Sequence, residues 1–551
     1  MGRVVVPSHP PERAPIVLVA LSLASLVACI PVAVDGGGAD ITGQPVRVTF
    51  LHTSDIHSRL YEYNFTPSFT DNELGLADGL GPYGGLAEMA YVLKRERARA
   101  GRVLHLDSGD CFQGAVVFNQ FAGEAEFRAM SAAGLDAAVV ANHEFDAGAA
   151  NLATQGATWA SFDMLAANYD FADSDLPFAT ELEDLVLPSR MVDLDGLRVG
   201  IIGMGNISSL NSIYDQSNSM GIRVIEPGEA IPDEAAKLRG LGADIIVVLS
   251  HLGLETDIEN AKLYPDIDLI LGGHNHIALD PPLVVINEAT GKRVPIVHSG
   301  AFAKFVGRLD IVVQDGAILS TDYQLFPIDG TVPEDPDVAE ILIEYKEKID
   351  YDLKLDQIIG YAETDLTRYG STGGDSMLGN LSAEAMRFYP GVETEIALTN
   401  TLGIRADVPA GDITLDTLFN SMPFDNTITT MFLSGREVQE LLDYATERST
   451  ERGCESQVQV AGIRFTMNCE DAVAQDILIN GAPLSTEGTY ELATNNYIAH
   501  GGSGFEVLER NTTQIDTGIS IRDVVMQSIS AARSLPQKGI AAEDGRIATV
   551  Y

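Results

Sequence analysis

The stretch Asn142-His143-Glu144-Phe145-Asp146 comes soon after the short apolar run Ala137–Val140 and brings an amide, an imidazole and carboxylates together. In an α/β fold, residues that follow parallel strands gather beyond the carboxyl edge of the sheet. Four further motifs with ligand-type side chains also follow short apolar runs, namely Asp55-Ile56-His57, Gly109-Asp110, Ser250-His251 and Gly273-His274-Asn275-His276. The five motifs therefore predict one site to which distant strands contribute.

The side chains in these motifs are typical ligands of divalent cations. Alternation along an extended segment turns Asp55 and His57 to the same side, and His274 and His276 have the same spacing. Asp110 follows a glycine, so its carboxylate can project freely and bridge two ions. Oxygen and nitrogen ligands without a thiolate suit Zn, Mn, Mg, Ca or Co better than a structural zinc. Taken alone, either histidine pair is more typical of a surface or core position than of a metal ligand.

Residues 46–330 alternate short apolar runs with helical patterns. Residues Tyr83–Ala100 are expected to form a helix with one apolar face. The expected strands are Val46–His52, Val103–Leu106, Ala137–Val140, Met164–Ala167, Leu197–Ile202, Ile245–Leu249, Ile267–Leu271 and Val294–Val297. This alternation predicts an α/β domain.

The composition changes near residue 328. Thr331–Pro336 carries two prolines and two acids, which is typical of a boundary, so residues 331–357 are expected to be a linker with a connecting helix at Val338–Ile349. Residues 358–551 are expected to form a smaller α+β domain. Its expected helices are Gly379–Phe388, Leu415–Asn420 and Gly435–Thr446, and its expected strands are Thr394–Leu398, Val458–Met467 and Tyr490–Thr494.

The overall charge excludes some partners. The chain has 551 residues and a net charge of -44, from 79 acidic against 35 basic residues. Such a surface repels nucleic acid polymers and anionic membranes, although solubility alone also accounts for it. A small anion can still bind where local metal charge outweighs the global field. The length exceeds what one core supports, so two or three domains are expected.

The N-terminus has the pattern of an export signal. Residues 14–28 are an apolar run preceded by Arg3 and Arg13. The ending Leu26-Val27-Ala28-Cys29 resembles the bacterial lipobox, which implies cleavage after residue 28 and a lipid on Cys29. Residues 29–45 then form a flexible tether, and the protein belongs to a bacterial cell envelope, periplasmic or at the surface. An uncleaved membrane anchor is the alternative.

Export permits disulfide bonds. Cys454 and Cys469 flank Gln457–Asn468, which alternates like a strand, and they can pair or remain two thiols. Cys111 directly follows Asp110 and is expected to pack beside the site without acting as a ligand or nucleophile.

The order of the five motifs resembles the calcineurin-like metallophosphoesterases and, more narrowly, the 5'-nucleotidase/UDP-sugar hydrolase branch. The resemblance covers roughly residues 46–550 and implies a four-layer α/β/β/α sandwich with two divalent metal ions. It implies one metal on Asp55, His57, Asp110 and His276, and the other on Asp110, Asn142, His251 and His274. His276 stands where several relatives carry an amide.

The implied reaction is cleavage of a phosphate ester. Two ions about 3.5–4 Å apart share a water, lower its pKa and supply a hydroxide that attacks phosphorus in line. The resemblance gives His143 and Asp146 the role of a catalytic dyad, in which Asp146 orients His143 and His143 stabilises the transition state.

The second half carries motifs that resemble the substrate-binding loops of this family. Asn400 and Arg405 stand where relatives hold nucleotide and phosphate. Pro423-Phe424-Asp425-Asn426 resembles a Pro-Phe-Gly-Asn turn, and Asn495-Asn496-Tyr497 matches the loop that carries a second aromatic residue. Phe424 and Tyr497 are therefore expected to enclose a base.

Three features depart from the family pattern. Ser503 stands where an aspartate usually binds the ribose diol, and a hydroxyl is a weaker acceptor than a carboxylate. Thr401 and Leu402 replace two glycines of the loop that begins at Asn400. An arginine usual before Gly379-Asn380-Leu381 is missing, and Arg368 is the candidate substitute.

Three functions follow as hypotheses. The first is an exported two-metal phosphoesterase acting on nucleotides as a 5'-nucleotidase, UDP-sugar hydrolase or 2',3'-cyclic-nucleotide phosphodiesterase. The second is a thiosulfohydrolase of the sulfur-oxidation type on the same scaffold, for which Phe424 and Tyr497 would be dispensable. The third is a surface ligand-binding lipoprotein without catalysis, which gives no reason to retain the complete ligand set.

Overall fold

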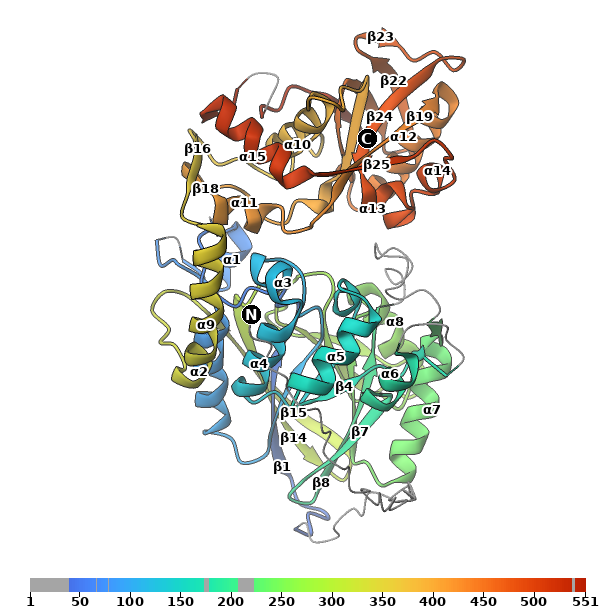
Figure 1. Ribbon diagram of the computed structural model, residues 1–551. Coiled ribbons are helices and arrows are strands. Elements are labelled where there is room, and N and C mark those ends of the chain that lie inside the picture. Colours follow the sequence, from blue (N-terminus) through green and yellow to red (C-terminus); the bar gives the residue numbers. More distant parts are fainter. Residues whose placement is uncertain (1–38, 66, 78, 173–177, 207–221, 538–540) are drawn as a thin grey trace, which may run out of the picture.

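The computed structural model describes residues 39–551 except 66, 78, 173–177, 207–221 and 538–540. The expected signal segment, Cys29 and most of the tether lie outside the described residues. The chain forms two domains, and helix α9 (Pro336–Leu353) lies along the first and leads to the second (Figure 1). Among the described residues, no helix combines the length and the apolar character that a membrane crossing requires.

The first domain contains two large sheets. The order in the seven-stranded sheet is β15 (Ala317–Pro327), β14 (Phe305–Gln314), β1 (Val46–Thr53), β2 (Val103–Asp107), β3 (Ala137–Val139), β4 (Asp163–Leu165) and β6 (Val186–Leu187). The order in the six-stranded sheet is β12 (Leu283–Ile286), β13 (Arg293–His298), β11 (Leu269–Gly272), β10 (Ile245–Ser250), β8 (Leu197–Met204) and β7 (Ser189–Leu194). Strands β1 to β4 run parallel in the first sheet, as do β8, β10, β11 and β13 in the second.

The two sheets pack face to face. Phe50 and Leu106 of the first sheet share one buried cluster with Val247 and Leu271 of the second. Every residue of β10 is buried, as expected of a central parallel strand rich in β-branched residues. The outer face of the seven-stranded sheet is covered by α2 (Leu86–Arg97), α4 (Glu124–Ala133) and α5 (Ala149–Trp159). The outer face of the six-stranded sheet is covered by α7 (Pro227–Gly240) and α8 (Leu254–Leu263). The expected four-layer α/β/β/α sandwich is confirmed.

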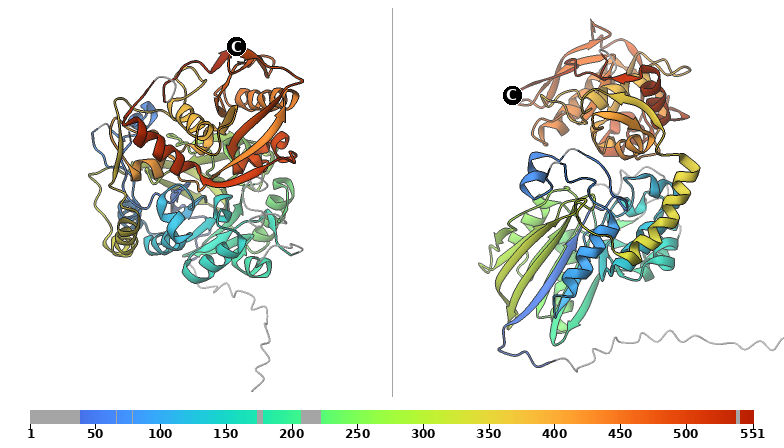
Figure 2. Two further views of the ribbon diagram at one scale, coloured as in Figure 1. Left: turned by 45° about the horizontal axis from the view of Figure 1, so that its top comes forward. Right: turned by 90° about the vertical axis from the view of Figure 1, so that its left-hand side faces the viewer.

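Shorter elements complete this domain. They are α1 (Phe69–Glu73), α3 (Val116–Phe121), α6 (Ala179–Leu185) and a two-stranded ribbon of β5 (Tyr169–Asp170) and β9 (Arg223–Val224). Helix α9 contacts α2 and α4, and the right-hand view of Figure 2 shows it leading up to the second domain.

The second domain is built on a five-stranded sheet. Its order is β20 (Val458–Ala461), β17 (Ile396–Asn400), β24 (Thr489–Asn495), β19 (Thr427–Ser434) and β25 (Ile515–Ser520). Leu398 and Met431 on one face pack with α12 (Gly435–Thr450). Ala397 and Ile428 on the other face pack with α10 (Met377–Arg387) and α15 (Ile521–Ala532).

Two small sheets and short helices surround this sheet. The sheets are β23 (Ala482–Pro483), β22 (Val473–Ile479), β21 (Ile463–Asn468) and β27 (Ile547–Val550), and β18 (Gly411–Thr414), β16 (Ile358–Ala362) and β26 (Ser534–Leu535). The helices are α11 (Leu415–Ser421), α13 (Asn496–Ala499) and α14 (Glu506–Glu509).

The prediction of one continuous strand at Val458–Met467 is wrong. Gly462 breaks it, with a φ of 72°, and β20 and β21 belong to different sheets. A Cβ at Gly462 would lie 2.4 Å from the carbonyl oxygen of Glu395, so only glycine fits this close approach. Apolar alternation continues through the break, which is why the sequence pattern does not reveal it.

A disulfide bond joins Cys454 and Cys469 across a separation of 15 residues, while Cys111 is a buried free thiol. The bond ties the turn after α12 to the end of β21. Closing a loop of this length restricts the unfolded chain.

We expect replacement of both Cys454 and Cys469 by serine to lower the free energy of unfolding of the second domain by about 3 kcal/mol, because the unfolded chain regains its freedom. Urea unfolding of the oxidised protein and the variant measures this difference. Equal midpoints and slopes for the two proteins would contradict it.

Candidate metal centre

The structure brings all five motifs to one place. They follow β1, β2, β3, β10 and β11, whose carboxyl ends meet at the same edge of the two facing sheets. Two groups of side chains each place their ligand atoms within 4.8 Å of one another: Asp55, His57 and His276, and Asp110, His251 and His274. Side chains about 220 residues apart in the sequence thus converge as the motifs predict.

In the first group, imidazole nitrogens face one another and a carboxylate. The Nε2 atoms of His57 and His276 are 2.9 Å apart, and the His276 nitrogen is 3.5 Å from Oδ1 of Asp55. His57 Nδ1 lies 2.8 Å from the carbonyl oxygen of Gln113, which fixes the proton on Nδ1 and leaves a lone pair on Nε2. Such an orienting contact is typical of a metal-binding histidine.

The second group is centred on Asp110. Its Oδ2 lies 2.9 Å from Nε2 of His251 and 4.0 Å from Nε2 of His57, so this carboxylate stands between the two groups. His251 Nδ1 donates to the carbonyl oxygen of Ser108 at 2.6 Å, which again turns Nε2 inward. The position of Asp110 fits a ligand shared by two ions.

Asn142 supplies an independent test of metal binding. Its Oδ1 is buried and has no hydrogen-bond partner in the described part of the chain. A buried amide oxygen without a partner is costly unless a cation or water satisfies it. His274 belongs to the same group as Asp110 and His251, and its Nδ1 lies 3.3 Å from Nδ2 of Asn206. The residues present therefore fit two divalent metal ions.

The electrostatics of the site also favour cations. Burial lowers the pKa of His251, but the carboxylates of Asp110 and Asp55 outweigh it and raise that pKa to about 10. Burial, followed by the charge of Arg405, holds the pKa of His57 well below its usual range, so this ring is neutral. Two buried carboxylates beside the neutral ring of His57 thus form a negative pocket, in which a divalent ion can take the place of the proton on His251.

The backbone at the site is strained. Left-handed φ angles between 49° and 77° occur at five of the expected ligands: Asp55, His57, Asp110, His274 and His276. Residues with a side chain rarely adopt this region, and such strain persists where the surrounding structure imposes it. Here the sharp turns after β1, β2 and β11 direct these side chains inward.

His143 and Asp146 lie beside the two groups. A short 3-10 helix at His143–Phe145 places Nδ1 of His143 2.6 Å from Oδ2 of Asp146. The His143 amide also donates to Oδ1 of Asp110 at 2.9 Å. Burial lowers the pKa of His143, but Asp146 and then Asp110 raise it above its usual value.

Glu144 has a role that its sequence motif does not reveal. Its carboxylate accepts the amides of Cys111 and Ala141, each at 2.7 Å, and the amide of Asp110 at 3.3 Å. It thereby joins the loops after β2 and β3. Glu144 is visible in the motif, but its partners are backbone groups that no residue pattern identifies. The same holds for the carbonyl groups that orient His57 and His251.

Two side chains of the second domain reach the metal centre. Nη2 of Arg405 lies 3.0 Å from Nε2 of His57. The Phe424 ring is 6.2 Å from the His143 ring and 5.8 Å from the guanidinium carbon of Arg405. The two domains thus face each other across this centre.

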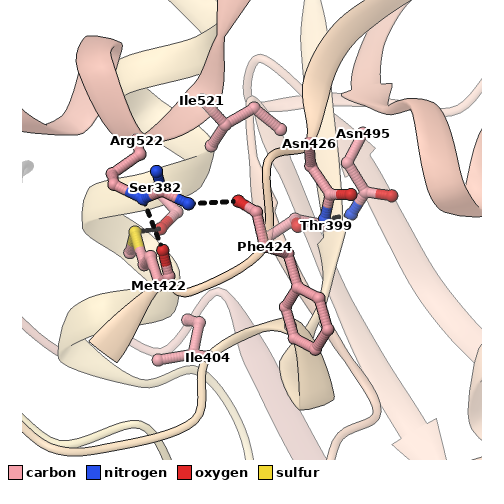
Figure 3. A pocket seen from close by; sticks show the side chains of 10 residues that line it. Ser382, Thr399, Ile404, Met422, Phe424, Asn426, Asn495, Ile521 and Arg522 are labelled. Carbon is pink, nitrogen blue, oxygen red and sulfur yellow. Dashed lines mark hydrogen bonds between the residues drawn. The ribbon is translucent and has the colours of Figure 1, made fainter. Parts of the chain in front are cut away.

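The other expected substrate-binding residues lie deeper in the second domain. Asn400 Oδ1 accepts from Asn495 Nδ2 at 2.7 Å, and Asn426 lines a pocket together with Phe424 and Asn495 (Figure 3). The Tyr497 hydroxyl lies 3.1 Å from Oγ of Ser503.

The residues that depart from the family pattern have identifiable contacts. Thr401 and Leu402 form a 3-10 turn that ends at Gly403. Arg368 donates from Nη1 to the carbonyl oxygen of Arg405 at 2.8 Å. Arg368 therefore supports the loop that carries Arg405.

We expect Asp110→Asn to reduce bound divalent metal from about two ions per chain to fewer than about one, because both groups lose their shared carboxylate. Elemental analysis after gel filtration from excess manganese gives the stoichiometry. Asp268→Asn is the control, since Asp268 is also buried but pairs with Arg239 and Lys292. Full metal content in the Asp110 variant would contradict the bridging position.

Comparison with known proteins agrees with this geometry. A family model of calcineurin-like phosphoesterase matches residues 48–278, and one of the 5'-nucleotidase C-terminal domain matches residues 358–510. The 5'-nucleotidase of Diplobatis ommata is 27% identical over 531 residues, covering 88% of this chain and 87% of its own, and the human 5'-nucleotidase is 26% identical, covering 91% and 90%.

Solved structures give the same result. The 5'-nucleotidase precursor from Thermus thermophilus is 30% identical with a TM-score of 0.81, and the match covers 92% of this chain and 99% of that one. A sulfate thiohydrolase from the same species has a TM-score of 0.75 at 20% identity, covering 91% and 96%, and thus shares the fold. With both domains matched and a centre that fits two divalent metals, the chain belongs to the 5'-nucleotidase family and is a metal-dependent phosphoester hydrolase.

Proposed function

We propose that this protein is an exported enzyme that hydrolyses nucleotides as a 5'-nucleotidase, UDP-sugar hydrolase or 2',3'-cyclic-nucleotide phosphodiesterase. The observation that supports it best is the approach of Arg405 and Phe424 to His57 and His143. A cation and an aromatic face beside a dinuclear centre match the two parts of a nucleotide, its phosphate and its base. This chain shares its fold with the sulfate thiohydrolase, but hydrolysis of a sulfur substrate gives the Phe424 ring no base on which to stack.

Each group has a distinct task in this proposal. Two bound divalent ions would be held by Asp55, His57, Asp110, Asn142, His251, His274 and His276, and would polarise the phosphoryl group and activate a water. Arg405 binds the phosphate, and Phe424 stacks on the base with Tyr497 on its other side. Asn400 and Asn426 orient the nucleoside.

His143 acts as a proton-carrying donor. Its Nδ1 proton is held by Asp146, so Nε2 can face the substrate. The neighbouring carboxylate of Asp146 favours the protonated ring, and the proton on Nε2 stabilises the charge that grows on the phosphoryl oxygens and the leaving group. Asp146 orients the ring and balances its charge.

We expect His143→Ala to retain its metals and to lose kcat by about 10²-fold or more, because the transition state loses one donor. Asp146→Asn is expected to lower kcat less, because the imidazole itself remains. Metal analysis together with turnover on p-nitrophenyl phosphate gives both quantities. Wild-type turnover in His143→Ala would refute this role.

The substrate class is tested with manganese or zinc by release of phosphate from AMP, of UMP from UDP-glucose and of adenosine monophosphate from 2',3'-cyclic AMP. Phe424→Ala is expected to raise KM for the preferred nucleotide about tenfold, since stacking contributes about 1–3 kcal/mol per base. Its KM for p-nitrophenyl phosphate is expected to change little. If no nucleotide is cleaved while the metal content is full, the nucleotide assignment is wrong.

We also propose that the mature protein begins at Cys29 and carries a lipid there, in a bacterial cell envelope. The apolar run at residues 14–28, which ends in Leu26-Val27-Ala28 directly before Cys29, supports this. The intact mass of the protein from its native membrane fraction tests it, since lipidation adds the mass of acyl chains to residues 29–551.

A further inference from the structure

Arg522 holds the loop that carries Phe424. The loop from Met422 to Asn426 joins α11 to β19 without regular structure, so its carbonyl groups need partners from elsewhere. Arg522 Nε donates to the Met422 carbonyl at 2.7 Å, and Nη2 donates to the Phe424 carbonyl at 2.9 Å (Figure 3). Nη2 also donates to the Pro423 carbonyl at 2.8 Å. One guanidinium thus satisfies three successive carbonyl groups.

The surroundings of Arg522 make this contact rigid. Its side chain is only 8% exposed, and its guanidinium carbon lies 4.1 Å from the centre of the Phe419 ring. The amide of the preceding residue, Ile521, donates to the carbonyl of Asn426 at 3.0 Å. The start of α15 therefore fixes the loop at both ends as well as at Phe424.

Asp425 extends the contact to the first domain. Its Oδ1 accepts from Arg522 Nη2 at 2.8 Å, and its Oδ2 accepts from Nδ2 of Asn119 at 2.8 Å. Asn119 belongs to α3 of the first domain. Asp425 occupies the position at which the Pro-Phe-Gly-Asn pattern has glycine, so this bridge uses a side chain that the pattern lacks.

We propose that Arg522 is a positioning residue that sets Phe424 beside the metal centre, and that Asp425 couples this loop to Asn119 when the two domains face each other. The inference rests on the proposed nucleotide hydrolysis only for its kinetic readout. It adds a specificity role for a side chain that touches neither the metal ligands nor the phosphate.

The alternative is a purely structural arginine, and the kinetics separate the two. Arg522→Lys keeps the charge but cannot contact three carbonyl groups with a planar fork. We expect it to raise KM for the preferred nucleotide about tenfold while kcat and the KM for p-nitrophenyl phosphate stay within about twofold, because only the base contact is misplaced. Arg522→Gln is expected to show a larger rise in the same KM.

Arg546→Lys is the matched control. Arg546 is also buried, and it binds the Val460 carbonyl and Asp544 away from the Phe424 loop. This variant is expected to lower the melting temperature without changing the nucleotide KM. An unchanged nucleotide KM in both Arg522 variants, or an equal rise for both substrates, would overturn the positioning role.

The bridge to Asn119 is tested without activity. Asp425 is 64% exposed, so Asp425→Asn and Asp425→Gly should fold. Spin labels on α4 and α12 report the distance between domains in the metal-loaded enzyme with and without AMP. Asp425→Gly, Asn119→Ala and their combination are expected to widen the distance distribution to the same extent, because each removes the same contact.

Additive effects of the two single changes, or an unchanged distribution of distances, would contradict the proposed coupling of the domains through Asp425 and Asn119. This measurement separates the two ideas. Failure of nucleotide hydrolysis in the wild type refutes the proposed function, whereas the distance measurement in the metal-loaded protein still decides whether Asp425 and Asn119 couple the domains.

Discussion

The structure depends on the carboxylate of Asp110, which is buried between two sets of imidazoles. Its charge and that of Asp55 create a negative pocket, which raises the pKa of His251. Two divalent cations would satisfy these groups and the buried oxygen of Asn142 at the same time. The left-handed backbone at five ligand positions is the conformational cost of this arrangement.

The second domain adds side chains to this centre. Its sheet carries loops whose side chains, Arg405 and Phe424, reach the centre held by the first domain. Neither domain contains the complete site. The buried guanidinium of Arg522 holds the loop that carries Phe424 through its carbonyl groups.

Much of the fold follows from local patterns. Buried runs such as Ile245–Ser250 identify the parallel strands, and the residues after them supply the ligands, because strand ends meet at one edge. The break at Gly462 and the role of Glu144 escaped prediction, since both depend on backbone groups brought close by distant segments. Arg522 likewise has no sequence signal, because its partners are carbonyl groups almost 100 positions away.

The sequence by itself determined the family and pointed to the candidate metal-ligating side chains, because these depend on residue types at fixed short spacings. Only the tertiary structure decided which nitrogen of His57 and His251 faces inward, how Asp110 stands between the two groups, and which residues of the second domain reach them. The reason is physical: hydrogen bonds to backbone carbonyls set the tautomers, and packing between domains sets the distances.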